Sequence, residues 1–300
     1  FGFLKYDIIY VIKNLTNIMK IVVLGNGAWG SALYSIVKSK HKEVSYWDEK
    51  NKIDLADVYI VCLPVQIMRS AIKRAKFEKG RKIVIINCSK GIEKKTNKLP
   101  FEIISETVKS DFDYYSLIGP SFASEVKEKK PTLVNVGYKN KCNTKLIKDL
   151  FVTNYFRIKF TKGVKELELS SALKNVYAIA CGVCDGLGYK INTRSLIISS
   201  AIQELYKIIN LKRTGVIGTI GDLVLTCSSN ESRNFKFGQL IAKYKIKDAL
   251  IKVGATVEGL GTVDSVKMFN KPLLNFVATI IKNDNPKKVK ERFDEFLNKI

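Results

Sequence analysis

The sequence predicts an α/β domain built on a parallel sheet, followed by an all-α domain in the C-terminal half of the chain. Up to about residue 160, short apolar runs alternate with segments of helical period. Strands that alternate with helices form a parallel sheet with helices on both faces. Beyond that point the apolar period is helical. We therefore expect a first domain over 19–163 and a second over 164–300.

Short, nearly continuous apolar runs mark the predicted strands, as in strands that are covered on both faces. These runs are Lys20–Leu24, Glu43–Trp47, Asp57–Leu63, Lys82–Asn87, Tyr114–Ile118 and Pro131–Val136. Helical spacing in the first domain is found in Ser31–Lys40 and Val65–Lys76. In the second domain it covers Lys165–Lys212, 235–252, 261–269, 272–281 and 286–299.

Residues 1–18 precede the first predicted strand. Lys5, Asp7 and Lys13 interrupt their apolar pattern, whereas a secretion signal has an unbroken apolar segment. We expect an extension that the fold does not use, and an interfacial membrane anchor is the alternative. No apolar run in the chain approaches the roughly 20 residues that span a bilayer.

The chain is strongly basic, with 51 Lys and Arg against 28 Asp and Glu and a net charge of +23. The lysines are spread through every segment and do not form one arm or alternate with aromatic residues, as single-strand binders do. This distribution favours a small phosphorylated partner over a specific nucleic-acid partner. A nucleic-acid complex would instead weaken steeply with salt.

The six cysteines lie mostly among apolar or small residues, which is typical of free thiols in a reducing cytoplasm. Cys181 and Cys184 have the spacing of a metal or redox pair. A second pair of ligands is not visible in the sequence, so we expect no metal site.

A glycine-rich turn, Gly25-Asn-Gly-Ala-Trp-Gly30, lies between the first predicted strand and the first predicted helix. In this context the G-x-G-x-x-G pattern indicates dinucleotide binding. The glycines allow a tight turn in which backbone N–H groups approach a pyrophosphate at the start of the helix. The turn therefore predicts a Rossmann-type first domain.

Asp48 follows the second predicted strand, eighteen residues after Gly30. An acidic side chain there accepts hydrogen bonds from the adenosine ribose, and a second acid, Glu49, would repel a 2′-phosphate. The pair slightly favours NAD over NADP. Lys50 and Lys52 could still meet a phosphate, and the segment up to Asp57 is too short for a full helix. We therefore expect NAD or NADP.

The single histidine, His41, lies among lysines before a predicted strand, which is typical of an exposed loop residue. The proton donor or acceptor is therefore expected to be another group, and a lysine with a lowered pKa is the natural candidate. Lys174 is flanked by Leu173, Val176 and Tyr177 in a predicted helix of mostly small residues. Asp222 stands in an apolar run, which is costly unless it is paired. Arg233 offers a planar fork for a phosphate. Lys90 follows the end of a predicted strand, at the edge that lines the ligand crevice of such sheets.

The motifs GNGAWG, SKGIE, GPSFASE, LKNVYAIACGVCDG, GDLVLTC, SRNFKFG and VEG occur in this order over about residues 20–262. Together they resemble the motif set of the bacterial NAD(P)-dependent glycerol-3-phosphate dehydrogenase family. The resemblance implies a cytoplasmic oxidoreductase that transfers a hydride reversibly between dihydroxyacetone phosphate and sn-glycerol 3-phosphate and feeds glycerophospholipid synthesis. A homodimer is compatible with it.

The resemblance also implies roles for individual residues. Lys174 would give a proton to the carbonyl oxygen during reduction, Lys90 would help to polarise that carbonyl, and Asp222 would orient Lys174. The implied substrate-binding residues are Lys90, Gly119, Ser121, Lys174, Asn175, Asp222, Thr226, Ser232, Arg233 and Asn234. The implied cofactor-binding residues are Gly25, Gly27, Ala28, Trp29, Gly30, Asp48, Glu49, Lys90, Ala123, Arg233, Thr256 and Glu258.

Two alternatives remain open from the sequence. One is another two-domain reductase, of the hydroxyacyl-CoA or ketopantoate type, although the poorly placed His41 disfavours the histidine-dependent kind. The other is a non-catalytic relative that binds a dinucleotide or a polyanion, as the charge and the short segment after Asp48 suggest. The family often has Ser at the position of Ala28 and Arg or His at that of Glu49, so the sequence leaves the choice of cofactor open.

Overall fold

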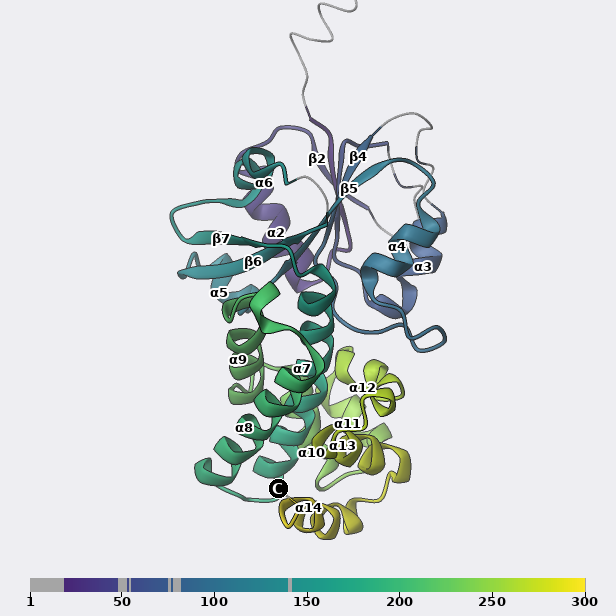
Figure 1. Cartoon of the computed structure of the whole chain (residues 1–300), viewed down its shortest axis with the longest axis vertical. Coiled ribbons are helices and arrows are strands. Elements are labelled where there is room, and N and C mark those ends of the chain that lie inside the picture. Colours follow the sequence, from purple (N-terminus) through teal and green to yellow (C-terminus); the bar gives the residue numbers. More distant parts are fainter. Residues whose placement is uncertain are drawn as a thin grey trace, which may run out of the picture.

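The computed structural model describes residues 19–47, 53, 55–74, 77, 82–139 and 142–299. Residues 1–18, together with Asp48 and Glu49, lie outside the described residues, so the expectations for them stay predictions. The described chain forms a sheet with helices on both faces, and a bundle of helices lies at one end of it (Figure 1).

The sheet has seven strands in the order β2-β1-β3-β4-β5-β6-β7. The strands are β1 (Ile21–Leu24), β2 (Val44–Trp47), β3 (Val58–Val61), β4 (Ile83–Asn87), β5 (Phe112–Ile118), β6 (Thr132–Tyr138) and β7 (Phe156–Thr161). Neighbouring strands are parallel except β5 and β6, which are antiparallel. The sheet is therefore mostly parallel, as predicted, with one reversal and one further strand, β7.

Two apolar cores lie on the two faces of the sheet. On one face, α2 (Ala28–Lys38) and α6 (Thr144–Phe151) bury their apolar sides, and α5 (Ala123–Lys127) packs against α2. On the other face lie α3 (Val65–Lys73) and α4 (Pro100–Thr107). Figure 1 shows the two groups of helices on opposite sides of the strands. This arrangement leaves the carboxyl ends of the first four parallel strands free to line a site.

The second half of the chain is helical, as the sequence predicts. Its α-helices are α7 (Val164–Gly186), α8 (Ile191–Ile208), α9 (Asp222–Ser228), α10 (Arg233–Ile241), α11 (Ile246–Val253), α12 (Glu258–Thr262), α13 (Pro272–Asn283) and α14 (Val289–Leu297). Shorter helical turns are η1 (Leu211–Arg213), η2 (Ile217–Gly221), η3 (Ser265–Phe269) and η4 (Pro286–Lys288). Within the described residues, we find no helix that is both long and apolar enough to span a membrane.

Helix α7 begins at the sheet and runs through the middle of the helical half (Figure 1). Gly182 on α7 and Gly238 on α10 let the two helices approach backbone to backbone. A Cβ on Gly182 would lie 2.0 Å from the carbonyl oxygen of Phe235, and one on Gly238 would lie 2.2 Å from that of Ile179. Larger residues would force the two helices apart. This contact keeps the start of α10 beside the polar residues of α7.

Candidate active site

A cavity of about 1020 Å³ lies between the sheet and the helical half. Its walls come from the ends of β1, β3 and β4 and from α7, α9, α10 and α12. The predicted site residues that line it are Gly25, Gly27, Ala28, Trp29, Gly30, Lys90, Ser121, Ala123, Lys174, Asn175, Asp222, Thr226, Ser232, Arg233, Asn234, Thr256 and Glu258. Residues from two halves of the sequence therefore meet around one space.

The glycine turn joins β1 to α2 at one end of this cavity. Gly25 has a φ of +106°, and a Cβ on Gly30 would lie 2.0 Å from the carbonyl oxygen of Gly25. By contrast, a Cβ on Gly27 would meet no atom within 4 Å. The first and third glycines are thus required for close packing of the turn, whereas the second leaves room above the start of the helix.

The start of α2 has the features of an anion site. Gly27 precedes the helix and has no side chain to cap it, and the first turn carries no acidic residue. Its backbone N–H groups and the positive end of the helix dipole therefore face the cavity. The buried indole nitrogen of Trp29 also has no hydrogen-bond partner among the described residues. The open N–H groups at the start of α2 line the cavity and fit the pyrophosphate of a dinucleotide, and the indole N–H of Trp29 is a further open donor beside them.

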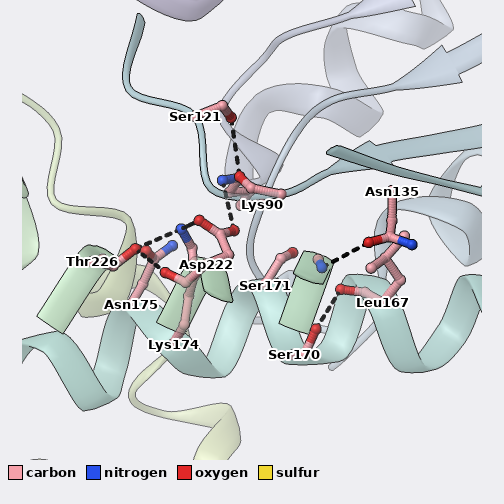
Figure 2. A network of polar contacts seen from close by, with 12 residues as sticks. Lys90, Ser121, Asn135, Leu167, Ser170, Ser171, Lys174, Asn175, Asp222 and Thr226 are labelled. Carbon is pink, nitrogen blue, oxygen red and sulfur yellow. Dashed lines mark hydrogen bonds and ion pairs between the residues drawn. The ribbon is translucent and has the colours of Figure 1, made fainter. Parts of the chain in front are cut away.

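Two lysines and one aspartate form the polar centre of the cavity (Figure 2). Lys174, on α7, donates from Nζ to Oδ1 of Asp222 at 2.5 Å and to Oγ1 of Thr226 at 2.8 Å. Lys90, just after β4, donates from Nζ to Oδ2 of Asp222 at 3.1 Å. One carboxylate therefore bridges two ammonium groups that come from different halves of the chain.

Burial sets the electrostatics of this centre. Lys174 is 4% exposed and Asp222 is 1% exposed. Burial lowers the pKa of Lys174 to about 8, and the charge of Lys90 lowers it too, although Asp222 acts in the opposite direction. Burial also disfavours the charge of Lys90, but attraction to Asp222 outweighs it and raises the pKa of Lys90. Near neutral pH the centre thus contains one firmly charged lysine and one that can exchange a proton.

A chain of polar contacts begins at Asn175, the residue after Lys174 on α7, and reaches the far wall. Asn175 donates to Oε2 of Glu258 at 3.2 Å and accepts from Asn234 at 3.1 Å. Arg233 donates to Oε1 of Glu258 at 3.2 Å, and Gly259 N donates to Oδ1 of Asn234 at 2.8 Å. These contacts join α7, α10 and α12. They hold an arginine at the mouth of the cavity, with its side chain 47% exposed.

Gly119 is the described site residue that the structure leaves outside the cavity lining. A Cβ at this position would lie 2.8 Å from Cα of Val134, so the glycine allows β5 and β6 to pack closely. Its carbonyl oxygen accepts a hydrogen bond from Ser121 at 3.0 Å. We therefore expect Gly119 to act through the shape of the chain before Ser121.

The cavity also has lining residues to which no role was assigned from the sequence. They are Asn26, Trp47, Cys62, Leu63, Pro64, Ile67, Cys88, Ser89, Phe122, Ser124, Leu225, Glu231 and Ala255. Trp47 ends β2, and others directly follow β3 or β4. The rule that ligands bind at the carboxyl ends of parallel strands is a signal that could have found these. Cys181 and Cys184, by contrast, are free thiols in the helical core.

The fold and the site together define a class of protein. A Rossmann-type domain with a glycine turn shares its cavity with a buried lysine of lowered pKa. This combination is typical of dehydrogenases that use a nicotinamide dinucleotide and protonate a carbonyl oxygen.

Comparison with known proteins identifies the family. A family model described as NAD-dependent glycerol-3-phosphate dehydrogenase N-terminus matches residues 48–144, and its C-terminus counterpart matches residues 164–291. Glycerol-3-phosphate dehydrogenase [NAD(P)+] of Bacillus pumilus is 31% identical over 294 residues, with 84% of this chain and 85% of the relative covered. That of Campylobacter lari is 34% identical over 288 residues, which cover 89% of this chain and 95% of the relative. The chain belongs to the NAD-dependent glycerol-3-phosphate dehydrogenase family.

Solved structures agree with the fold. The crystal structure of glycerol-3-phosphate dehydrogenase from Coxiella burnetii superposes with a TM-score of 0.83 at 23% identity, covering 93% of this chain and 98% of that chain. The Plasmodium falciparum glycerol-3-phosphate dehydrogenase gives a TM-score of 0.74 at 22% identity, with 92% and 95% covered. The predicted two-part architecture is thereby confirmed.

Proposed function

We propose that this chain catalyses the reversible, NAD(P)-dependent interconversion of sn-glycerol 3-phosphate and dihydroxyacetone phosphate. The observation that carries the proposal is the bridge from Lys174 through Asp222 to Lys90, in the same cavity as the glycine turn. The names of the relatives support the choice of substrate. A non-catalytic relative would have no need for a buried lysine with a pKa of about 8.

The glycine turn and the start of α2 would hold the pyrophosphate of the dinucleotide, and the indole N–H of Trp29 offers a further donor. When bound, the nicotinamide supplies or accepts the hydride. Asp48 and Glu49 favour NAD over NADP by charge, and this preference remains a prediction from the sequence.

Reduction of the ketone builds negative charge on its oxygen, and the two lysines respond to that charge in different ways. Lys174, with a pKa of about 8, gives a proton to this oxygen and takes it back in the oxidation. Lys90 stays charged and stabilises the developing oxyanion electrostatically. Asp222 holds both ammonium groups, which limits the reorganisation needed during the reaction.

The start of α10 is our proposed site for the substrate phosphate. Ser232 caps this nine-residue helix and accepts a hydrogen bond from Phe235 N at 3.3 Å. Arg233 uses one N–H group on Glu258, so most of its donors remain for an anion at the cavity mouth. The neighbouring Asn234 and the positive end of the helix dipole add to the attraction.

We also propose a cytoplasmic location. All six cysteines are free thiols, which a reducing compartment maintains. The homodimer that is compatible with the family stays a prediction, and the mass of the purified chain in sedimentation would test it.

The experiment is an absorbance assay of the purified chain with dihydroxyacetone phosphate, run side by side with NADH and NADPH. We expect oxidation of at least one reduced cofactor, faster with NADH. Dihydroxyacetone without its phosphate is the matched control, and we expect it to react at least about a hundredfold more slowly in kcat/KM. No turnover of the phosphorylated ketone with either cofactor would refute the proposed function.

A further inference from the structure

A second buried carboxylate, Glu168, lies outside the cavity and takes no part in the mechanism above. It is 1% exposed and belongs to the beginning of α7. Its Oε1 accepts hydrogen bonds from Tyr114 Oη, from Ser116 Oγ at 3.1 Å and from Asn87 Nδ2 at 3.3 Å. Its Oε2 accepts from Phe101 N at 3.1 Å. One side chain of α7 therefore contacts β4, β5 and the start of α4.

This carboxylate is unusual because no cation in the described part of the chain forms an ion pair with it. Burial raises the pKa of Glu168 to about 7, although its four hydrogen-bond donors act to lower it. A buried charge without a cationic partner is costly, so stability alone gives little reason for a carboxylate at this position. The donors that surround Glu168, and Asn87 above all, indicate its role.

The contact with Asn87 leads directly to Lys90. Asn87 is the last residue of β4. Its Oδ1 accepts from Ser89 N at 3.0 Å, and its Nδ2 donates to Ser89 O at 3.2 Å as well as to Glu168. The side chain of Asn87 thus holds Ser89, the residue before Lys90, by both the backbone N–H and the backbone C=O of Ser89. Lys90 then extends from this fixed backbone to Asp222.

We propose that Glu168 is a positioning residue for the reaction: through Asn87 and Ser89 it fixes the backbone of Lys90 relative to α7. Because Lys174 lies on the same helix, α7 then determines the positions of both ammonium groups on Asp222. The inference rests on the proposed function, since it assigns Glu168 a part in placing a group of that site.

The test is Glu168→Gln, which keeps the shape of the side chain but replaces one acceptor oxygen by a donor. Glu204→Gln is the matched control. Glu204 is also a buried carboxylate with a raised pKa and accepts a hydrogen bond from Leu273 N at 2.6 Å, but it lies in the helical core without a contact to the site. A merely structural role predicts that both variants lose stability and keep their kcat/KM.

We expect Glu168→Gln to lower kcat/KM for dihydroxyacetone phosphate by about tenfold to a hundredfold, while its KM for NADH changes by less than about twofold. For the control Glu204→Gln, kcat/KM for dihydroxyacetone phosphate and KM for NADH should both stay within about twofold of wild type. In the protein without substrate, amide hydrogen exchange at Ser89 should become at least about tenfold faster in Glu168→Gln and not in the control.

Asn87→Ala is a second test variant, needed if Glu168→Gln does not fold. It removes the side chain that connects Glu168 to Ser89 and leaves Glu168 with three hydrogen-bond donors. It should show the same loss of kcat/KM, and adding Glu168→Gln to it should cause little further loss. A folded variant of either kind with wild-type kcat/KM, or with wild-type exchange at Ser89, would overturn the inference. An inactive wild type is a different result, which refutes the proposed function and the inference with it.

Discussion

Replacing Asp222 by Asn removes the charge that both lysines share and keeps the size of the side chain. In the wild type, Oδ1 and Oδ2 accept from Lys174 at 2.5 Å and from Lys90 at 3.1 Å, and the carboxylate is 2% exposed. The substitution leaves two ammonium groups side by side in a buried site. Each then loses the carboxylate to which it donates, so the charged forms of both become less favourable.

The expected magnitude follows from the pKa of Lys174. Burial lowers this pKa from 10.5 to about 8 even with Asp222 present, which corresponds to about 3 kcal/mol against the charged form. An opposite charge at this range raises a lysine pKa by about 1 to 3. Without that charge the pKa of Lys174 should fall to about 7 or lower. At pH 8 its protonated fraction then drops from about half to about a tenth or less.

The assay is the pH dependence of kcat for reduction of dihydroxyacetone phosphate, measured between about pH 5.5 and 9.5. Asp222→Asn should shift the alkaline midpoint to lower pH and reduce kcat at pH 8 by about a hundredfold. Cofactor binding measured by fluorescence, together with circular dichroism, serves as the control for folding. A variant that keeps the wild-type midpoint would refute the assignment of Asp222 as the partner of a titrating Lys174.

Three further predictions concern the wild-type pH profile, the glycine turn and the buried acid. Wild-type reduction should be fastest below pH 8 and decline above it, whereas oxidation of glycerol 3-phosphate should rise through the same pH, because Lys174 donates in one direction and accepts in the other; rates of both reactions across pH check this. Gly30→Ala should weaken cofactor binding by at least about tenfold, measured by fluorescence titration, since its Cβ would lie 2.0 Å from the oxygen of Gly25. The folded state of Glu168 binds its proton up to about pH 7 and the unfolded state only up to about 4.5. Urea unfolding should therefore show that the stability of wild type relative to Glu168→Gln falls by about 3 kcal/mol as pH rises through this window.

Much of the fold could be predicted because local patterns determine it. The buried strands Ile21–Leu24 and Val58–Val61 are continuous apolar runs. The reversed direction of β6 leaves no trace in its own sequence, since side chains alternate in the same way in either direction. The edge strand β7 was missed because its charged residues, such as Arg157, obscure the apolar pattern. The segment of helical period over Lys165–Lys212 is divided into α7 and α8 near Gly188, whose φ is +86°.

The sequence could predict those site residues that belong to short motifs. Residues such as Lys174 and Arg233 belong to short ordered motifs, and the structure brings them to one cavity. The pKa of Lys174 depends on distances to Asp222 and Lys90, which are far away in the sequence, so the direction of its shift could not be derived beforehand. Glu168 was missed for the same reason, because its donors come from three other elements.

The measurement that tests the central claim most directly is a single-turnover reduction of dihydroxyacetone phosphate by Lys174→Met, which keeps the volume of the side chain but has no proton to give. We predict that the rate of NADH oxidation falls by about a thousandfold, while NADH binds with nearly wild-type affinity. A Lys174→Met rate within about tenfold of wild type would contradict the account.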